Sequence, residues 1–486
     1  MSIRRVTMGR AWVILAALGL LLALPACGGG DEEGGDQATP VAATGTTSAG
    51  TSTLSSATVT PSGKTVEISL WHSEVASNLE TIENLARRFN DSQSEVRVKL
   101  AYQGLDEEEI TKLVASLGGG DVPTIASLAE IHTQRMIDSG AIVPMQEFVD
   151  ADDYDLSDLD EKAVKYYTLD DKLWAMPFTG AVPLLYYDKV TFREVGLDPE
   201  SPPKDLDELR EASAKMLKRD ANGNVTRSGV AIDITGWYLD SILEEHDDLY
   251  ANNENGRTGR ATEVLFDGPT GQAFFQWWHD MVKEGLAIDV GQNPTGADTF
   301  LTIGSGRAGM CFGSSAALRS VVDVLEGGLQ GRDVELGVAN QPGVPGGSGL
   351  PGIYGRSFWI LKSRPKEEQE AGWKFIKWLM EPEQQAEWYA GSGYLPVNVK
   401  AFDLPAAEEI ETKYPQFKTI AELYLAAPAN TAHLGPLLGP FNEIRIDIVR
   451  HAIEEMLVGD KDPIAAINDA AKEANELLED YNRRIE

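Results

Sequence analysis

Polar and apolar residues alternate over 66–70 and again over 96–102, and apolar residues recur at helical spacing over 79–89. Alternation with period two predicts strands, and a period near 3.6 predicts an amphipathic helix. The order strand, helix, strand predicts a largely parallel sheet with a right-handed crossover. Trp71, His72 and Ser73 come at the carboxyl end of the first strand, the edge where open α/β sheets bind ligands. The pattern therefore predicts an α/β protein.

A stretch in the middle of the chain, residues 173–188 (LWAMPFTGAVPLLYYD), holds two apolar runs around a centre of small residues at 179–181. Pro177 and Pro183 each remove a backbone donor and bias the preceding residue toward extended geometry. Gly180 lets the backbone approach a bound molecule closely. The stretch predicts two strands that lead from one lobe into a second, or else one buried strand with an internal bend.

The remaining pattern predicts further elements of both kinds. Asn222-Gly223 and Asn255-Gly256 predict hairpin turns, and prolines at 365 and 382 stand where helices can begin. We expect strands at 123–128, 310–315 and 358–361, helices at 205–218, 274–282 and after 463, and a Gly/Pro loop at 341–352.

The N-terminus has the pattern of a secretory signal. Arg4, Arg5 and Arg10 precede an apolar run over 11–23, which is shorter than the roughly 20 residues of a membrane span. The next residues, Leu-Pro-Ala-Cys27, resemble a bacterial lipobox, in which the cysteine is lipidated. The alternative is an ordinary signal peptide that contains a cysteine. Residues 28–63 are rich in Thr, Ser, Ala and Gly, which predicts a disordered linker.

The net charge and the cysteine count limit the kinds of partner and the covalent links that we expect for this chain. The 486 residues carry a formal charge of −34, which argues against nucleic acid because phosphate backbones require basic patches. Hydrophobic residues make up 42% of the chain, enough for large cores. With Cys27 lipidated, Cys311 is left alone in an apolar context, so it is expected to be a core residue and no disulfide framework is expected.

The search for catalytic and cofactor motifs leads to a binding protein rather than an enzyme. Neither HExxH nor GxSxG occurs, and no cofactor is expected. Asp220, Asn222 and Asn224 have the spacing of a calcium loop, but Val225 and Ala231 stand where such a loop needs glycine and glutamate. A turn is favoured there, and a calcium ion stays possible. A glycan-cleaving enzyme with two carboxylates is a remote alternative.

Several motifs in order carry a family resemblance over roughly 64–478. The chain resembles the extracellular solute-binding proteins of ABC importers, closest to the members that bind glycerol-3-phosphate and related to binders of maltose and oligosaccharides. The motifs are the lipobox, WHS after the first strand, LWAMPFTGAVPLLYYDK, GMCFGSS, YGRSFWIL, Gly-Tyr-Leu-Pro at 393–396, and LGPFNEIR before a long helix.

The resemblance implies the type II fold of periplasmic binding proteins, with two α/β lobes joined by three crossings near 179–182, 352–355 and 397–400. Residues 64–180 and 354–398 form the first lobe, and 181–353 and 399–486 the second. The lobes of a monomer close over a small molecule, and the closed form is recognised by a membrane permease. We therefore expect an exported protein that is held at the outer face of the membrane by Cys27, or that is periplasmic.

The resemblance assigns the phosphate of the ligand to Arg445, in LGPFNEIR. The fork of donors in a guanidinium suits a pair of phosphate oxygens. The alternative is an ion pair on the helix face with Glu443 or Asp447.

Four more residues match family positions that contact the ligand. Tyr394 matches the tyrosine of GYLP, and Ser314 and Ser315 match a serine pair of which one donates to the ligand. Gly355 matches a glycine whose backbone N–H reaches the phosphate.

Glu130 matches the acid that binds glycerol hydroxyls, and Trp237 matches the aromatic platform beneath the glycerol. Three positions depart from the family pattern. Asp106 replaces a tyrosine, Gly180 replaces a serine and loses its donor, and Arg356 replaces a small residue. The resemblance leads us to expect glycerol-3-phosphate or a glycerophosphodiester. The smaller wall and the new cation count against glycerol-3-phosphate itself, whereas a glycerophosphodiester keeps the phosphate and fits the extra room. The alternative is a mono- or oligosaccharide, stacked on aromatic rings and hydrogen-bonded to Asp106 and Glu130.

Overall fold

The computed structural model describes residues 64–293, 296–326, 332–352 and 354–485. The predicted signal segment, Cys27 and the predicted linker to residue 63 lie outside the described residues. In the described part of the chain, no helix is long and apolar enough to span a membrane.

One of the two large sheets is built mainly from the first half of the chain. Its strands lie in the order β15-β7-β14-β3-β1-β2, with β4 beside β14. The strands are β1 (Val66–His72), β2 (Val96–Tyr102), β3 (Ile125–Ala129), β4 (Ile142–Val143), β7 (Met176–Ala181), β14 (Tyr354–Leu361) and β15 (Leu395–Pro396).

The other large sheet has the order β11-β10-β12-β8-β13, with β9 beside β10. Its strands are β8 (Pro183–Asp188), β9 (Lys218–Arg219), β10 (Val225–Ile232), β11 (Ala287–Asp289), β12 (Ala308–Ser314) and β13 (Leu336–Asn340). A separate pair joins β5 (Thr168–Leu169) to β6 (Lys172–Leu173).

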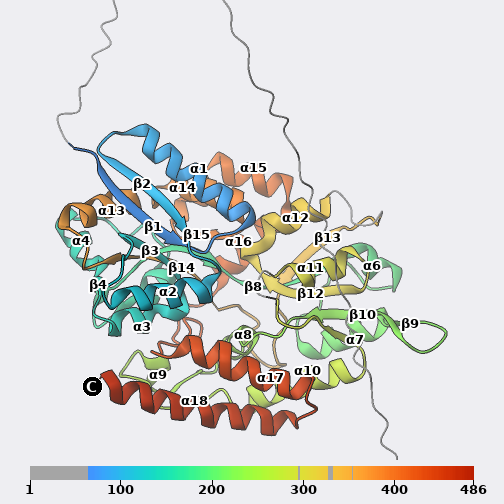
Figure 1. The fold of residues 1–486 in the computed structure, drawn as a ribbon. Coiled ribbons are helices and arrows are strands. Elements are labelled where there is room, and N and C mark those ends of the chain that lie inside the picture. The colour runs from blue at the N-terminus through green and yellow to red at the C-terminus, as the bar shows by residue number, and fades with distance from the viewer. Residues whose placement is uncertain (1–63, 294–295, 327–331, 353, 486) are drawn as a thin grey trace, which may run out of the picture. The chain divides into compact units, whose positions relative to one another are not determined.

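Helices surround both sheets, and in Figure 1 α1 and α14 lie above the first sheet while α2 and α3 lie below it. The helices that follow strands of the first sheet, or precede the second, are α1 (Ala76–Ser92), α2 (Asp106–Leu117), η1 (Glu130–His132), α3 (Thr133–Asp138), α4 (Met145–Asp152) and α5 (Glu161–Tyr166). Those of the middle of the chain are α6 (Lys189–Glu194), α7 (Leu206–Met216), α8 (Trp237–Glu245), α9 (Asn252–Gly256), α10 (Pro269–Lys283), α11 (Ala297–Gly304), η2 (Ser315–Ala317) and α12 (Leu318–Glu326). The last are α13 (Lys366–Leu379), α14 (Pro382–Ser392), η3 (Val399–Asp403), α15 (Pro405–Lys413), α16 (Pro415–Ala426), η4 (Glu443–Val449), α17 (Arg450–Leu457) and α18 (Pro463–Ile485).

The predicted β-α-β start of the fold is confirmed. β1 pairs in parallel with β2 from Val66 opposite Val96 to His72 opposite Tyr102, and also in parallel with β3. Because the three strands run in the same direction, their carboxyl ends meet at one edge of the sheet. The segments that follow these strands are therefore brought together.

The stretch over 173–188 passes from one sheet to the other. β7 belongs to the first sheet and β8 to the second, and only Val182 separates them. This excludes the alternative of one buried strand with a bend. The segment between β13 and β14 makes a second passage, and the chain after β15 packs α16 against β13. The exact lobe boundaries, 180/181, 353/354 and 398/399, stay predictions.

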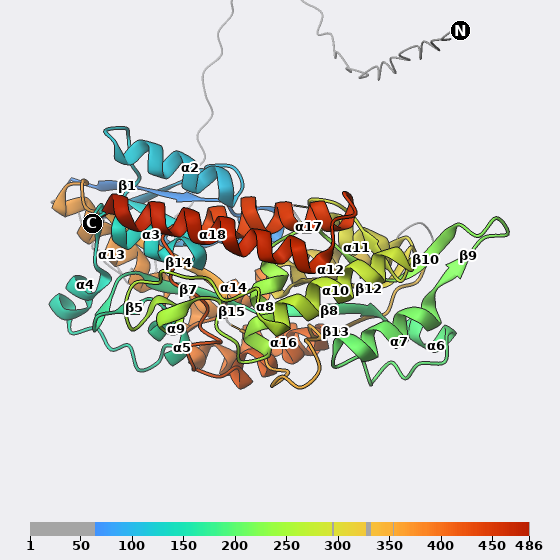
Figure 2. The same ribbon diagram turned by 90° about the horizontal axis from the view of Figure 1, so that it is seen from below.

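Each sheet has its own core. The cluster on the first sheet includes Phe89, Leu128, Phe178 and Trp359, and the cluster on the second includes Tyr238, Trp278 and Phe312 with α17 and α18. α17 and α18 pack against each other and are red in Figure 2. Cys311 is fully buried in a third cluster beside Tyr186, as expected for a core residue.

Of the two predicted hairpin turns, one is confirmed and one is wrong. Asn222-Gly223 lies in the turn that joins the antiparallel strands β9 and β10. Asn255-Gly256 instead ends a left-handed turn in which Asn253, Glu254 and Asn255 have φ of 54°, 53° and 58°. The Asn255 side chain holds this turn, because it accepts from the backbone N–H of Ala251 and donates to the carbonyl of Thr431.

Candidate functional site

Three acidic residues follow the three parallel strands of the first sheet. Glu74 comes after β1, Asp106 begins α2 after β2, and Glu130 begins η1 after β3. Because these strand ends meet at one edge, the three carboxylates gather there. The acidic first turn of α2, residues 106–109, also suits the positive end of the helix dipole.

Arg356, on β14, is buried beside two of these acids, Glu74 and Asp106, and beside Glu109 of α2. Its Nε lies 3.1 Å from Glu74 Oε1, its Nη1 lies 2.9 Å from Asp106 Oδ1, and its Nη2 lies 3.1 Å from Glu109 Oε2. Nη2 also donates to the carbonyl of Ser127. Every nitrogen of this guanidinium therefore has an oxygen partner within the first sheet and its loops.

The pKa values of the carboxylates around Arg356 are shifted in different directions. Burial raises the pKa of Glu109 to about 8, although Arg356 partly offsets it, and burial also raises the pKa of Glu74. Burial acts in the same direction on Asp106, but Arg356 and His132 outweigh it and hold that pKa below its usual range. His132 Nε2 lies 3.1 Å from Asp106 Oδ2. One arginine thus shares its charge among three acids, and Asp106 is the acid held as a carboxylate.

Arg445 forms a second charged cluster, and this one joins the two sheets. Its Nη1 donates to Glu130 Oε1 at 3.4 Å and to Asp240 Oδ2 at 3.2 Å. Glu130 follows β3 of the first sheet, whereas Asp240 lies on α8, which follows β10 of the second. The alternative pairing of Arg445 with Glu443 or Asp447 is not found, because Glu443 pairs with Arg135 and Asp447 lies beside Arg450.

The two arginines differ in how fully they are engaged. Both acidic partners of Arg445 are reached through Nη1, and its Nε is buried without a hydrogen-bond partner among the described residues. An unpaired buried donor is costly, so a site of this kind gains free energy when an acceptor arrives. Arg356 offers no such donor, whereas Arg445 does.

Arg445 lies on η4, a stretch of π-helix, the rare form that occurs often at functional sites. The N-terminus of α8 packs directly against this stretch. A Cβ atom on Gly236 would lie 2.3 Å from the backbone oxygen of Arg445. Only glycine at 236 permits this approach, which brings Trp237 and Asp240 on α8 close to Arg445.

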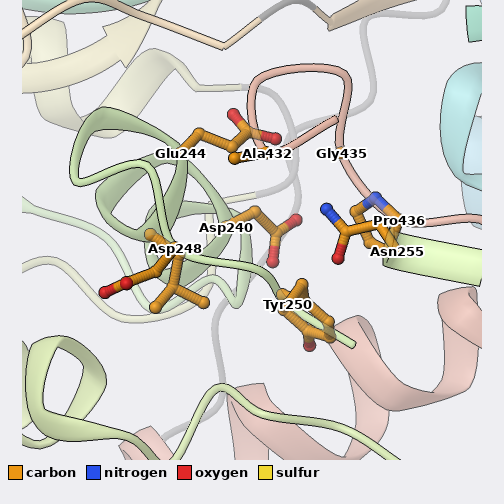
Figure 3. A pocket seen from close by; sticks show the side chains of 9 residues that line it. Asp240, Glu244, Asp248, Tyr250, Asn255, Ala432, Gly435 and Pro436 are labelled. Carbon is orange, nitrogen blue, oxygen red and sulfur yellow. The ribbon is translucent and has the colours of Figure 1, made fainter. Parts of the chain in front are cut away.

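Asp240 also lines a small pocket, whose residues come from α8, the segment over 248–250, the left-handed turn and the loop over 432–436 (Figure 3). Asp240 Oδ1 is buried without a partner among the described residues. Burial raises the pKa of Asp240 to about 7, and the opposing effect of Arg445 is smaller. The group therefore titrates near neutral pH. The residues lining the pocket are Asp240, Leu243, Glu244, Asp248, Tyr250, Asn255, Ala432, Gly435 and Pro436.

Aromatic side chains adjoin the charged groups. Trp237 packs edge-to-face on Tyr354, with ring centroids 5.2 Å apart, and the Tyr354 hydroxyl donates to buried Glu244. Tyr394 stacks on Trp388 at 5.9 Å. Charges on Glu74, Asp106 and Glu130 all act on the Tyr394 hydroxyl, whose pKa is raised first of all by burial.

Three of the expected ligand-binding residues make hydrogen bonds within the protein, and the space expected at a fourth is filled. Ser315 Oγ accepts from the backbone N–H of Val182, and Ser314 Oγ accepts from that of Ala316. The Gly355 N–H donates to Glu130 Oε2 at 3.2 Å. The extra room expected at Gly180 is absent, because a Cβ there would lie 2.4 Å from the ring of Tyr424. That expectation was wrong because it considered the glycine without the residue packed on it.

The structure adds residues that the sequence reasoning missed: Glu74, Glu109, Asp240, Glu244 and Tyr354. The acidic first turn of α2 was a usable signal for Glu109, and the position after WHS was one for Glu74. Asp240 and Glu244 are one helical turn apart on α8, but nothing local distinguishes them from surface acids. In the described part of the chain, no group of three or more His, Cys, Asp or Glu is arranged to hold a metal ion. Asp220 accepts from the backbone N–H groups of Asn222 and Asn224, as in a turn.

Comparison with known proteins identifies the family. Residues 84–419 match the family described as bacterial extracellular solute-binding protein. The sn-glycerol-3-phosphate-binding periplasmic protein UgpB of Yersinia pseudotuberculosis is 29% identical over 424 residues, which are 86% of this chain and 93% of that protein. The protein of the same name from Salmonella typhimurium is 29% identical over 423 residues, with the same coverage.

Solved structures share the fold. UgpB from Mycobacterium tuberculosis in complex with glycerophosphocholine has a TM-score of 0.71 at 18% identity, covering 86% of this chain and all of that one. Maltose-bound MalE3 of T. maritima has a TM-score of 0.70 at 20% identity, covering 85% of this chain and all of that one. These likenesses confirm the predicted two-lobe α/β fold of type II. The chain belongs to the bacterial extracellular solute-binding proteins, the components of ABC importers that bind a small molecule and deliver it to the permease.

Proposed function

We propose that this protein captures a glycerophosphodiester or glycerol-3-phosphate. One observation carries the proposal: Arg445 reaches its two acidic partners through Nη1 alone, and its buried Nε has no partner among the described residues. A phosphate oxygen at Nε would satisfy that donor with a charge-assisted hydrogen bond. The relatives from Yersinia and Salmonella, which are named for sn-glycerol-3-phosphate, support the same class of ligand.

The acidic surroundings favour the diester. Glu130 and Asp240 both contact Arg445, so a phosphate bound there would lie close to other negative groups. A diester carries one negative charge, and a monoester near neutral pH carries up to two, so the monoester meets more repulsion. An alcohol with a positive charge would gain from Asp106, which is held as a carboxylate. The Mycobacterium tuberculosis protein was solved with glycerophosphocholine, a ligand of this kind.

Calorimetry with glycerophosphocholine and with sn-glycerol-3-phosphate tests the phosphate site. Charge-assisted hydrogen bonds contribute on the order of 1.5–3 kcal/mol each, so Arg445→Ala should weaken binding at least about tenfold. Arg445→Lys should recover only part of the loss, because a point charge lacks the fork.

The matched control is Arg364→Ala, which removes a partly buried arginine that pairs with Glu368 in the first lobe. Its affinity should equal that of the wild type. Arg356→Ala should act mainly on stability and lower the melting temperature, because it leaves the buried Glu74 and Glu109 without their positive partner. If Arg445→Ala binds both phosphate ligands as tightly as the wild type, the phosphate site is refuted.

The second candidate is a mono- or oligosaccharide, and the edge-to-face pair of Trp237 and Tyr354 beside several carboxylates favours it. Sugars stack on aromatic rings and donate hydroxyl hydrogen bonds to carboxylates. In that case Trp237→Ala should weaken binding more than Arg445→Ala, and added salt should hardly change the affinity.

We further propose that the protein acts as an exported monomer without catalytic activity, anchored to the membrane by a lipid on Cys27. The support is the charged and apolar N-terminal pattern and the Leu-Pro-Ala-Cys sequence. The family match is consistent with this location.

A further inference from the structure

Asp138, the last residue of α3, is a buried carboxylate with a full set of donors. Gln134 Nε2 and Arg260 Nη2 donate to its Oδ1 at 2.8 and 2.7 Å. Arg260 Nη1 and the Tyr481 hydroxyl donate to its Oδ2, both at 3.0 Å. The side chain is 5% exposed. A carboxylate this deeply buried depends on these partners, since an unpaired buried charge is strongly unfavourable.

The donors come from two different parts of the fold. Gln134 shares α3 with Asp138, and α3 lies between strands β3 and β4 of the first sheet. Arg260 precedes Ala261, and Tyr481 lies on α18, and both Ala261 and α18 belong to the core cluster of the second sheet. Three of the four hydrogen bonds to Asp138 therefore cross from one sheet's side of the molecule to the other.

Neighbouring contacts also join α3 to the part of the chain that packs with the second sheet. Arg135 Nη2, also on α3, lies 2.5 Å from Glu443 Oε2, and its Nε donates to the carbonyl of Gly439. A Cβ on Gly439 would lie 1.9 Å from the Tyr481 ring, so glycine at 439 lets this ring reach the interface. Arg445, Glu130 and Asp240 make none of these contacts, although Glu443 shares η4 with Arg445. α3 also directly follows η1, which carries Glu130 of the Arg445 cluster.

We propose that Asp138, Arg260 and Tyr481 form an interlobe latch that stabilises the closed form of the protein and so sets its affinity. When the lobes separate about the hinge, Arg260 and Tyr481 leave Asp138, and water replaces them. The latch stabilises the closed form alone. The apparent affinity scales with the fraction of protein that is in the closed form, so a stronger latch tightens the binding of any ligand that requires closure. The inference rests on hinge closure and not on the identity of the ligand.

Pulsed electron paramagnetic resonance on ligand-free protein tests the latch. Spin labels at Val114→Cys on α2 and Val458→Cys after α17 report the opening, because Glu107 of α2 and Arg450 of α17 are in contact at 3.2 Å. Both label positions are exposed, and Cys311 is fully buried. The background is Cys27→Ala, so that only the two introduced cysteines are labelled.

We expect the wild type to show a short-distance population. Tyr481→Phe should lower the closed-to-open ratio about tenfold, the effect of one hydrogen bond to a charged group. Asp138→Asn should lower the ratio at least as much, because it also removes the charge that pairs with Arg260. The double variant should lose less than the sum of the two, because the two side chains are hydrogen-bonded to each other.

The matched control is Tyr187→Phe, which removes a hydroxyl bonded to the carbonyl of Pro199 within the second lobe. It should leave the closed-to-open ratio unchanged even if it lowers the melting temperature as much as Tyr481→Phe does. Ratios within twofold of the wild type in both latch variants overturn the proposal, and so does a ligand-free wild type with no closed population. Because no ligand is added, failure of glycerophosphates to bind leaves this test intact.

Discussion

Arg356 and Arg445 are both buried arginines surrounded by carboxylates, yet they differ in what they can still bind. The three nitrogens of Arg356 contact Glu74, Asp106 and Glu109, so its charge is paired with the acids that follow β1 and β2. The Nε of Arg445 is buried without a partner among the described residues. At the scale of single residues, this difference makes Arg445 the better candidate for an anion and Arg356 the better candidate for positioning Asp106.

The titration of Asp240 should make binding of an anionic ligand depend on pH. Burial raises the pKa of Asp240 to about 7, above its unfolded value of about 3.9. As the pH rises through 7, the ionised group pairs more strongly with Arg445 and repels phosphate. Calorimetry with glycerophosphocholine, which does not titrate in this range, should show affinity falling several-fold from pH 6 to pH 8, on the order of 1 kcal/mol.

The Asp240→Asn variant should bind with a flatter pH profile. Glu109 is the necessary control, because burial raises its pKa to about 8 and it titrates in the same range. If the affinity of Asp240→Asn still depends steeply on pH while that of Glu109→Gln does not, the pH dependence comes from the Arg356 cluster and the prediction is contradicted. The free energy of unfolding should change with pH in the same direction as the affinity. A raised pKa favours the neutral acid in the folded state, so its contribution is complete below about pH 4 and is lost as the pH rises through 7.

At the scale of elements, the site depends on how closely α8 and η4 approach. α8 carries Trp237 and Asp240, and η4 carries Arg445. The contact between them is made at Gly236, where a Cβ would lie 2.3 Å from the Arg445 backbone oxygen. A side chain at 236 must displace one of the two elements, because the obstacle is backbone rather than a flexible side chain.

Gly236→Ala should therefore destabilise the protein and weaken binding together. Overpacking of this kind costs typically about 1–3 kcal/mol, measurable by urea unfolding, and the displaced Arg445 should lower the affinity for glycerophosphocholine. Gly118→Ala is the matched control, since its Cβ would meet nothing closer than 3.7 Å. Wild-type affinity in Gly236→Ala would contradict the close approach as a requirement of the site.

At the scale of the molecule, contacts between the two sheets cluster in separate places. The Arg445 cluster joins η1 to α8, and the Asp138 latch joins α3 to α18 and the segment at Arg260. η1 and α3 are consecutive in the chain, so the proposed ligand contact at Glu130 and the proposed latch at Asp138 lie on one short stretch of the first lobe.

Anchoring is a property of the whole chain and is tested in a bacterial host. The wild type should sediment with membranes, and Cys27→Ala should be released, because the lipid on Cys27 is the proposed anchor. Cys311→Ala controls for the loss of a cysteine as such, since Cys311 is buried in the core. Equal partition of wild type and Cys27→Ala would remove the lipid from the proposal.

Much of the architecture could be predicted because its signals are local. The alternation over 66–70 and 96–102 and the helical period over 79–89 gave the β-α-β start, and the prolines at 365 and 382 marked where α13 and α14 begin. The stretch over 173–188 did lead from one sheet to the other. In each case neighbouring residues decide the backbone conformation, so a short window of sequence holds the information.

The Asn255-Gly256 prediction failed because a dipeptide signals a hairpin only where two strands flank it. The side chain of Asn255 instead bonds to Ala251 and to Thr431, which is far along the chain. A partner so distant leaves no mark on the local pattern.

The sequence by itself predicted the β-α-β start, several further strands and helices, and, as one of two interpretations, the passage of the chain between two sheets over 173–188. Only the tertiary structure decided which charges meet: Arg445 with Glu130, Arg356 with Glu109, and Asp138 with Arg260 and Tyr481. It also placed the Tyr424 ring over Gly180, where room for a ligand had been expected. The physical reason is that periodicity and turn chemistry act between neighbours, whereas ion pairs and packing act between residues brought together only when the lobes have folded.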